Sequence, residues 1–341
     1  MNVYVLNTLG IGEDTIELIS HEIKIKGVIG LSKRDRTDKI SDYSFQGHLS
    51  KKMGIQFVEV SSYTLSDEKD KEILLNLDID VLIISGWQRL IPDWLIQHCS
   101  ICAIGSHGSP LGITKGRGRS PQNWALIMGM ESFEISIFQV DKGIDSGRVF
   151  ASKKFKYSTF DTIKTSYYKV CFLTSQMIID ILKTPNFIQK EYQQQIEDEA
   201  EYFPQRKSDD GGIDWHRSNK EIRNQIRGLT KPYPGATSSF QGNIIKIWDA
   251  IPFEIDIPAE RYRIGEIVKI FNKRDILVRT KESFLLVTDY SLETNNIELK
   301  SGIILESVNF TNQMKAIIDR HQDKYRNLTI SKEIITFANK V

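Results

Sequence analysis

Residues 80–85, with the sequence DVLIIS, constrain the fold of this 341-residue chain more than any other segment. A strand that is apolar on both faces is typical of the centre of a parallel sheet, where helices cover both sides. Near the N-terminus, two apolar segments, residues 3–6 and 26–31, flank residues 13–22, whose apolar spacing indicates a helix. The sequence therefore predicts an α/β domain with a parallel-rich sheet.

Two predicted strands end in polar turns that contain an imidazole and a carboxylate. We expect residues 106–110, Ser-His-Gly-Ser-Pro, to form a loop beyond the apolar strand 101–104. Residues 133–140 read as another strand, and the turn after it places Asp145 between glycines. A single loop histidine or an Asp-x-Gly turn is more often structural than catalytic. Open α/β sheets bind ligands beyond the carboxyl ends of their strands, so His107 and Asp145 together indicate a functional site.

Three stretches between residues 107 and 147 resemble the signature of the folate-dependent N-formyltransferases. They are His107-Gly108-Ser109-Pro110-Leu111, residues 117–125 with the sequence RGRSPQNWA, and Asp141-x-Gly143-x-Asp145-x-Gly147. The family includes methionyl-tRNA, glycinamide ribonucleotide and sugar N-formyltransferases, and the chain is most similar to the sugar enzymes. A second block, within residues 202–236, resembles the start of the C-terminal domain of the methionyl-tRNA and sugar enzymes. The resemblance implies a Rossmann-like formyltransferase domain followed by a small β-barrel, similar to an OB fold.

The resemblance also implies a catalytic set of an asparagine, a histidine two residues later and an aspartate in the second loop. His107 and Asp145 match this set, but Gly105 stands where the asparagine is expected. A glycine has no side chain that can donate a hydrogen bond to the formyl oxygen. Either Ser106, His107 and backbone N–H groups therefore stabilise the oxyanion, or the activity is altered.

The same resemblance implies that N10-formyltetrahydrofolate is the co-substrate and that no metal is required. In the family, the segment after the central strand holds the pterin ring largely through backbone groups, and residues 86–92 fall there. The expected cofactor-binding residues are Gln88, Arg89, Leu90, Ile91, Asp141, Lys142, Gly143 and Ile144. Without the resemblance, residues 86–92 read as an ordinary strand-to-helix turn, with Pro92 near the first helical position.

Lys115, Arg117 and Arg119 form a short basic segment beside the predicted site. This segment is either a solvated turn or a binding site for the phosphates of an anionic substrate. We include Arg117 and Arg119 among the expected substrate contacts, together with Ser109 and Asn123.

Charge bears on the choice of substrate. The chain has 45 Lys and Arg residues against 44 Asp and Glu residues, a net charge of +1. Binding of tRNA normally needs a basic surface, so the expected substrate is a nucleotide-linked amino-deoxysugar, a surface-glycan precursor. The alternatives are methionyl-tRNA formylation and, because of Gly105, a non-catalytic protein that binds folate or a nucleotide. An RNA-binding role for the β domain is disfavoured because basic and aromatic residues are not clustered.

The resemblance and the turn signals divide the chain into four parts. Residues 1–185 are the predicted catalytic domain, and the polar, Gln- and Glu-rich residues 186–201 read as a linker. Short alternating segments within residues 202–300 predict the C-terminal β-barrel-like domain. Residues 301–341 are an extension with a helix-like segment, and the sequence assigns no function to it.

Composition limits the other classes of protein. No apolar run approaches the roughly 20 residues of a membrane-spanning helix, and the N-terminus begins with a strand-like pattern instead of a basic segment. We therefore expect a cytoplasmic enzyme that contacts neither membrane nor nucleic acid, and a homodimer is left open. Cys99 and Cys102 are spaced as in zinc or redox sites, but no second pair accompanies them, so we expect buried, reduced thiols.

Overall fold

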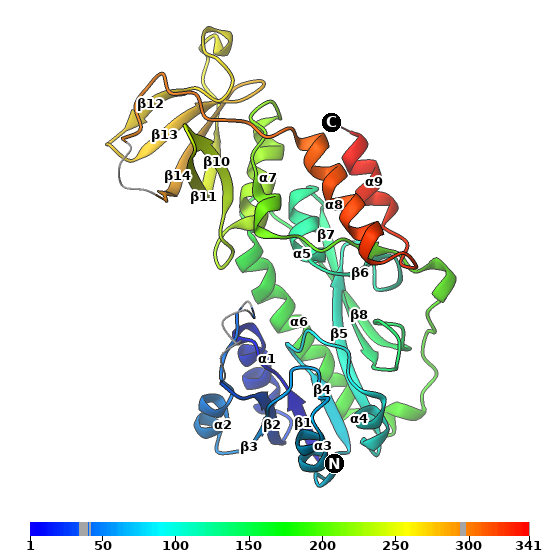
Figure 1. Ribbon diagram of the computed structural model, residues 1–341. Helices are drawn as coiled ribbons and strands as arrows, with labels where there is room; N and C mark the ends of the chain where they lie inside the picture. Colours follow the sequence, from blue (N-terminus) through cyan, green and yellow to red (C-terminus); the bar gives the residue numbers. More distant parts are fainter. Residues whose placement is uncertain (34–39, 41, 294–297, 341) are drawn as a thin grey trace. The chain divides into compact units, whose positions relative to one another are not determined.

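The computed structural model describes residues 1–33, 40, 42–293 and 298–340, and the chain divides into two compact units (Figure 1). Unit 1 consists of Met1–Arg117, Glu134–Phe155 and Tyr167–Glu199, and unit 2 consists of Gly118–Phe133, Lys156–Ser166 and Ala200–Val341. This division differs from the expected domain boundaries, because residues 118–133 and 156–166 group with the C-terminal half. The reason is packing within unit 2, where helix α5 (Pro121–Ile127) lies against α7 (Asn219–Leu229).

Within the described residues, unit 1 is built on a seven-stranded sheet. Across the sheet the strands are β3 (Gln56–Val60), β2 (Ile25–Leu31), β1 (Val3–Leu6), β4 (Val81–Ile84), β5 (Cys102–Ser109), β7 (Ser132–Gln139) and β8 (Val149–Lys156). Strands β3 to β5 in this order pair in parallel, and β7 pairs antiparallel with β5. The predicted α/β fold with a parallel-rich sheet is confirmed. The strand order changes direction between β1 and β4, which is the switch point where such sheets bind ligands.

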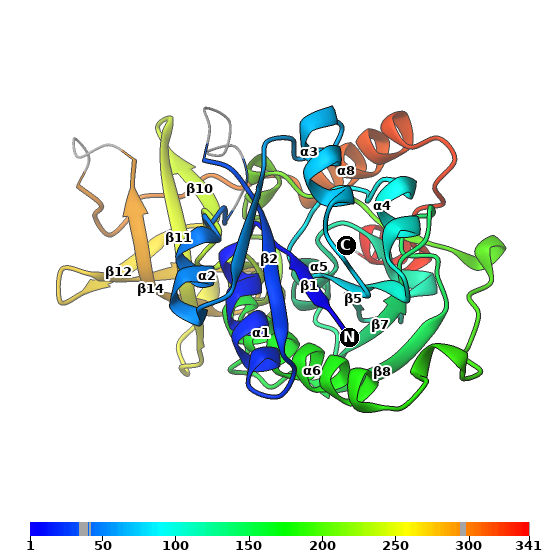
Figure 2. The ribbon, with the colours of Figure 1, turned by 90° about the horizontal axis from the view of Figure 1, so that it is seen from below.

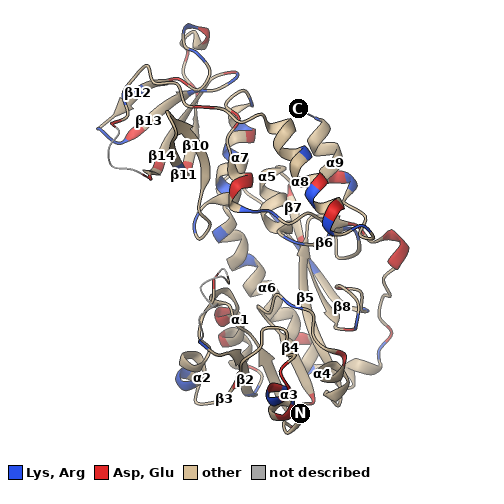
Figure 3. Ribbon diagram, viewed as in Figure 1, with Lys and Arg blue, Asp and Glu red and all other residues tan. Residues whose placement is uncertain are grey.

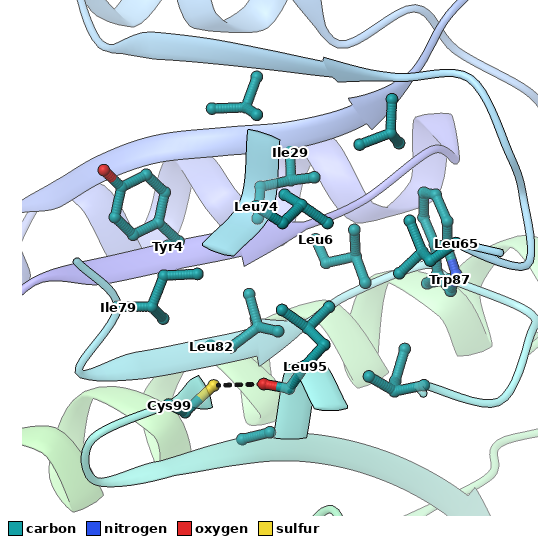
Figure 4. Close-up of a cluster of buried hydrophobic side chains, with 14 of the residues drawn as sticks. Tyr4, Leu6, Ile29, Leu65, Leu74, Ile79, Leu82, Trp87, Leu95 and Cys99 are labelled. Atoms are coloured by element: carbon teal, nitrogen blue, oxygen red, sulfur yellow. Dashed lines mark hydrogen bonds between the residues drawn. The ribbon is translucent and has the colours of Figure 1, made fainter. Parts of the chain in front are cut away.

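Helices cover both faces of this sheet (Figures 1 and 2). They are α1 (Gly10–Ser20), α2 (Gly47–Met53), α3 (Glu68–Leu75), α4 (Asp93–His98) and α6 (Ile163–Lys183). On one face α6 lies beside α1, where Ser175 Oγ donates to Thr15 O at 3.3 Å. On the other face Leu74 of α3 and Leu95 of α4 pack into the apolar core (Figure 4). Within the described part of the chain, no helix has the length and apolar character needed to span a membrane.

Strand β5 extends further than the sequence predicts. Residues 106–109, expected in a loop, continue β5 and pair with β7 as far as Ser109↔Glu134, so that expectation is wrong. Pairing with β4 stops one residue before them, at Ile84↔Gly105. His107 therefore lies on a strand just beyond the end of β4, and a strand fixes a functional side chain more firmly than a loop does.

Unit 2 contains, within its described residues, a five-stranded antiparallel sheet. In order across the sheet the strands are β10 (Ala236–Phe240), β11 (Asn243–Phe253), β14 (Phe284–Leu292), β13 (Asp275–Arg279) and β12 (Ile267–Phe271). Residues 302–306 join the two edges, since Ser239 bridges to Glu306 and Glu266 bridges to Ile304. These bridges close the sheet towards a barrel and place residues 302–306 within it, although the expected domain ended at residue 300.

The remainder of the C-terminal extension belongs to unit 2. It forms helices α8 (Phe310–Lys324) and α9 (Lys332–Asn339), of which the second was not predicted. Arg217 connects them, because its guanidinium carbon lies 3.7 Å from the centre of the Phe310 ring and 5.6 Å from that of Phe337. The same guanidinium pairs with Glu221 at 3.1 Å. A cation close to aromatic rings is a favourable contact, and it holds both helices to α7 within unit 2.

Candidate active site

Each ring nitrogen of His107 contacts a hydrogen-bond acceptor. Nδ1 lies 3.3 Å from Asp145 Oδ2, and Nε2 donates to Gly116 O at 2.7 Å. The side chain is 10% exposed. The structure thus brings His107 and Asp145 together in a geometry by which a carboxylate orients an imidazole for proton transfer.

The turn after β7 places the Asp145 carboxylate. Asp145 itself has a left-handed backbone with φ of 51°, and Asp141 Oδ1 stabilises the turn by accepting from Ser146 Oγ at 2.6 Å. A β-carbon on Gly147 would lie 1.8 Å from Gln139 O. Glycine at position 147 therefore lets the turn fold back onto the end of β7, which fixes where the carboxylate meets the imidazole.

A larger side chain at Gly105, where the resemblance implies an asparagine, would require neighbouring side chains to shift. A β-carbon there would lie 2.9 Å from Phe138 Cζ and 3.0 Å from Val140 Cγ2. The ends of the Phe138 and Val140 side chains thus lie next to the position that the β-carbon of an asparagine would take. Ser106, the next residue, is exposed and lies beside a cavity, so its hydroxyl is available to a ligand.

This cavity has a volume of about 210 Å³ and lies in unit 1 at the carboxyl end of β4, beside Gly105 and Ser106 of β5, where the pairing of the two strands stops. Its lining residues are Ile84, Gly86, Trp87, Gln88, Arg89, Leu90, Ile91, Gly105, Ser106, Phe138, Val140, Asp141, Gly143 and Asp145. Six of the eight residues expected at the cofactor are among them, and Lys142 and Ile144 are not. The cavity reaches Asp145, so a ligand inside it lies next to the carboxylate that contacts His107.

Aromatic residues that were not among the expected cofactor contacts shape the cavity and its loop. Trp87 and Phe138 contribute apolar walls. Tyr63 supports the loop from outside, since Gln88 N donates to its hydroxyl at 3.1 Å and the Arg89 guanidinium carbon lies 4.5 Å from the centre of its ring. Apolar walls with a few backbone and polar groups suit a flat heteroaromatic ring such as a pterin. Tyr63 could not be found from local patterns, because it lies 25 residues from Gln88.

Arg117 was expected to contact substrate phosphates, but it is buried in unit 1. Its side chain is 0% exposed, Nη1 lies 2.8 Å from Glu197 Oε1, and Nη2 donates to Gln195 Oε1 at 3.0 Å. The guanidinium has no exposed surface and is already paired with Glu197, so it is not accessible to a diphosphate and that contact is not assigned to Arg117. Ser109, another expected substrate contact, is also buried, and its Oγ accepts from Leu111 N at 3.1 Å.

The other two expected substrate contacts belong to unit 2. Asn123 is 3% exposed, and its Nδ2 donates to Gly228 O at 2.9 Å, which links α5 to α7. Arg119 follows β6 (Arg117–Gly118) and is half-buried, and its N–H donates to Phe203 O at 3.1 Å. Asn123 therefore has a structural role here, whereas the side chain of Arg119 retains access to solvent.

Cys99 and Cys102 are buried free thiols, as the sequence predicts, and Cys171 is buried and free as well. Burial raises the pKa of Cys99 to about 11 and that of Cys102 to about 12. Cys99 Sγ also donates to Leu95 O at 3.3 Å. In the described ranges, no group of three or more His, Cys, Asp or Glu residues is arranged to hold a metal ion.

We expect these thiols to be unreactive in the folded protein. With the pKa of Cys99 at about 11 instead of 9.0, about a hundredfold less thiolate is present at pH 8, and thiolate is the reactive form. Timed labelling with a chromogenic disulfide reagent should therefore be slow for the native chain and fast in guanidinium. Rapid labelling of the native chain would contradict the burial of these thiols.

Two family models match most of the chain. The model described as "Formyl transferase" matches residues 17–182, and the one described as "Formyl transferase, C-terminal domain" matches residues 206–301. The bifunctional polymyxin resistance protein ArnA of Wigglesworthia glossinidia brevipalpis is 30% identical over 259 residues, 72% of this chain and 38% of ArnA. The methionyl-tRNA formyltransferase of Caldanaerobacter subterraneus subsp. tengcongensis is 28% identical over 261 residues, 76% of this chain and 81% of that protein.

Solved structures show the same fold at low sequence identity. HypX from Aquifex aeolicus has a TM-score of 0.59 and 14% identity, over 97% of this chain and 50% of HypX. An N-formyltransferase from Helicobacter canadensis, in complex with folinic acid and dTDP-3-aminofucose, has a TM-score of 0.58 and 15% identity, over 85% of this chain and 100% of that chain. The chain thus spans about half of HypX and less than half of ArnA.

Proposed function

Because the chain belongs to the formyl transferase family, we propose that it transfers a formyl group from N10-formyltetrahydrofolate to the amino group of a nucleotide-linked amino-deoxysugar. The contact between His107 and Asp145 beside the cavity of unit 1 carries this proposal. It supplies a positioned proton-transfer pair within reach of a bound ligand. A cytoplasmic location is part of the proposal, since three buried free thiols are usual in a reducing compartment.

The cavity residues would hold the folate. Gln88, Arg89, Leu90 and Ile91 line one side of the cavity, and Asp141 with Gly143 lines another. When bound, the co-substrate would supply the formyl carbon that an amine attacks, and tetrahydrofolate would leave as the bond between that carbon and N10 breaks and N10 takes up a proton. Tyr63, through its contacts with Gln88 and Arg89, keeps the first of these loops in place.

His107 and Asp145 handle the charges of the reaction. An attacking amine has to lose a proton as its bond to the formyl carbon forms, and negative charge develops on the formyl oxygen. In our proposal His107 stabilises that oxygen or transfers the proton, while Asp145 orients Nδ1 and accepts a proton directly or through water. For Nε2 to serve the substrate, its hydrogen bond to Gly116 O has to be exchanged for one to the substrate.

The missing asparagine needs a substitute. Phe138 and Val140 fill the space next to Gly105, so we assign the additional donor to Ser106 and to backbone N–H groups of β5. The rival function, a non-catalytic protein that binds folate or a nucleotide, rests on Gly105 alone. It predicts folate binding without turnover.

The substrate assignment rests on charge. The net charge is +1, and acidic and basic residues are interspersed along the helices and strands (Figure 3). Binding tRNA would require several Lys or Arg contacts to phosphates, whereas a nucleotide-sugar presents only a diphosphate. The relatives include a protein named methionyl-tRNA formyltransferase, and a structural neighbour was solved with dTDP-3-aminofucose. Methionyl-tRNA formylation is therefore the alternative that the experiment has to separate.

Incubation with N10-formyltetrahydrofolate and a panel of nucleotide-linked amino-sugars tests the function. We expect one sugar to gain the mass of a formyl group, and no formylation of methionyl-tRNA in a parallel reaction. Efficient formyl-methionyl-tRNA synthesis would overturn the substrate assignment. Folate binding without any formylated product would favour the non-catalytic rival.

Arg119 is the remaining candidate for the diphosphate. Replacement by alanine should raise the KM for the nucleotide-sugar about tenfold and leave kcat nearly unchanged, the size expected for one charge-assisted hydrogen bond. Steady-state kinetics measures both parameters. Arg274→Ala, which removes an exposed arginine from the turn between β12 and β13, is the matched control and should change neither. An unchanged KM for Arg119→Ala would remove this residue from the substrate site.

A further inference from the structure

We propose that Gln195, in the segment that reads as a linker, is a positioning residue for His107; this inference rests on the proposed function of the same site. The Gln195 amide makes four hydrogen bonds within unit 1. Its Nε2 donates to Asp145 O and to Gly147 O, each at 2.7 Å. Its Oε1 accepts from Arg117 Nη2 at 3.0 Å and from Thr114 Oγ1 at 3.1 Å.

These four partners belong to the two loops that hold the imidazole. Thr114 and Arg117 flank Gly116, whose carbonyl accepts from His107 Nε2 at 2.7 Å. The other loop contains Asp145, whose carboxylate meets Nδ1 at 3.3 Å. One amide therefore ties together the partners of both ring nitrogens. A displacement of either loop would change the orientation of the ring.

The contacts of Gln195 need both the donor and the acceptor of its amide group. The two carbonyl oxygens of the turn need a donor, and the guanidinium and hydroxyl of the other loop need an acceptor. A glutamate at position 195 would keep the acceptor but would direct a carboxylate oxygen at two carbonyl oxygens. An alanine would remove all four hydrogen bonds. Replacement by glutamate therefore disrupts the hydrogen bonds to Asp145 O and Gly147 O while it keeps an acceptor for Arg117.

Asp145 has particular need of this support. Its φ of 51° is a left-handed conformation that is unfavourable for an L-residue, and it persists only where its surroundings impose it. The hydrogen bond from Gln195 to the carbonyl of Asp145 acts on this same residue. The contact thus holds the backbone that carries the carboxylate.

The segment around Gln195 is itself anchored to the sheet. Val149 N donates to Gln193 O at 2.9 Å, which adds a bridge to β8. The Tyr192 ring packs edge-on against Phe150 with 4.8 Å between ring centres. Two residues further along, Glu197 pairs with the buried Arg117 at 2.8 Å. Gln195 is therefore held on both sides, as a residue that positions others has to be.

Three variants of the full chain test the inference: Gln195→Ala, Gln195→Glu and, as a matched control, Gln194→Ala in the exposed neighbouring glutamine. Both changes at Gln195 should lower kcat for formyl transfer about ten- to hundredfold, because small displacements of a catalytic group are costly. The KM for the folate should change less than kcat, since Gln195 does not line the cavity itself and contacts only the turn that forms one side of it. Gln194→Ala should match the wild type in both parameters.

The ¹⁵N resonances of the His107 ring give a readout that does not depend on turnover. We expect them to shift in Gln195→Ala and Gln195→Glu and to stay unchanged in Gln194→Ala. Unchanged His107 resonances in both Gln195 variants would overturn the inference, and so would a lower melting temperature with unchanged kcat. If the wild type transfers no formyl group, the proposed function fails, whereas shifted resonances would still support the positioning of His107 by Gln195.

Discussion

Replacing His107 with alanine should lower kcat for formyl transfer by about two to four orders of magnitude, the usual effect of removing a positioned acid–base or oxyanion group. The fold should persist, because the side chain lies at the end of a strand and its two partners belong to loops. Turnover and circular dichroism of the same preparation measure the two effects.

The chain offers a matched control for this change. His216 also contacts a carboxylate, with Nδ1 3.2 Å from Asp214 Oδ1, but it is largely exposed and lies in unit 2. His216→Ala should therefore keep kcat within about twofold of the wild type, as most surface changes do. Near-normal turnover in His107→Ala would show that the pair in unit 1 is not the catalytic one.

The parts of the fold that the sequence could predict depend on local periodicity. The apolar run at residues 80–85 contains β4 (Val81–Ile84), and the alternating segments after residue 235 became the strands of unit 2. The extension of β5 through Ser109 could not be predicted, since it depends on pairing with β7 and the local composition is that of a loop. Residues 302–306 were likewise assigned to the extension, because two isolated bridges to distant strands define their place.

In the site, too, local sequence patterns could be interpreted and contacts between distant residues could not. The spacing of glycines around Asp145 and the apolar strand before His107 indicated which residues meet, because both signals are local. The burial of Arg117 could not be foreseen, because its partner Glu197 lies 80 residues away in a polar segment. Gln195 was missed for the same reason. Its segment was interpreted as a linker from its polar composition, and composition contains no information on which residues Gln195 contacts.

A second large effect is expected from Gly147→Ala. The added β-carbon would lie 1.8 Å from Gln139 O, a backbone atom of the sheet, so the turn has to move. Moving it displaces the Asp145 carboxylate from His107, and a shift of about 1 Å at a catalytic group costs about a hundredfold in rate. We therefore expect kcat to fall about a hundredfold, with a moderate loss of stability from the strain. Steady-state kinetics and thermal melting measure the two effects.

A double-mutant cycle shows whether this loss acts through Asp145. Asp145→Ala alone should lower kcat by two to four orders of magnitude, as the loss of the group that orients His107. If the displaced turn acts only through this carboxylate, Gly147→Ala adds almost nothing in a chain that already has Asp145→Ala, and the two effects are far from additive. Additive losses would mean that Gly147→Ala damages the cavity or the fold independently of the carboxylate. The cycle thus separates the position of Asp145 from the general integrity of unit 1, and it does so with the same assay.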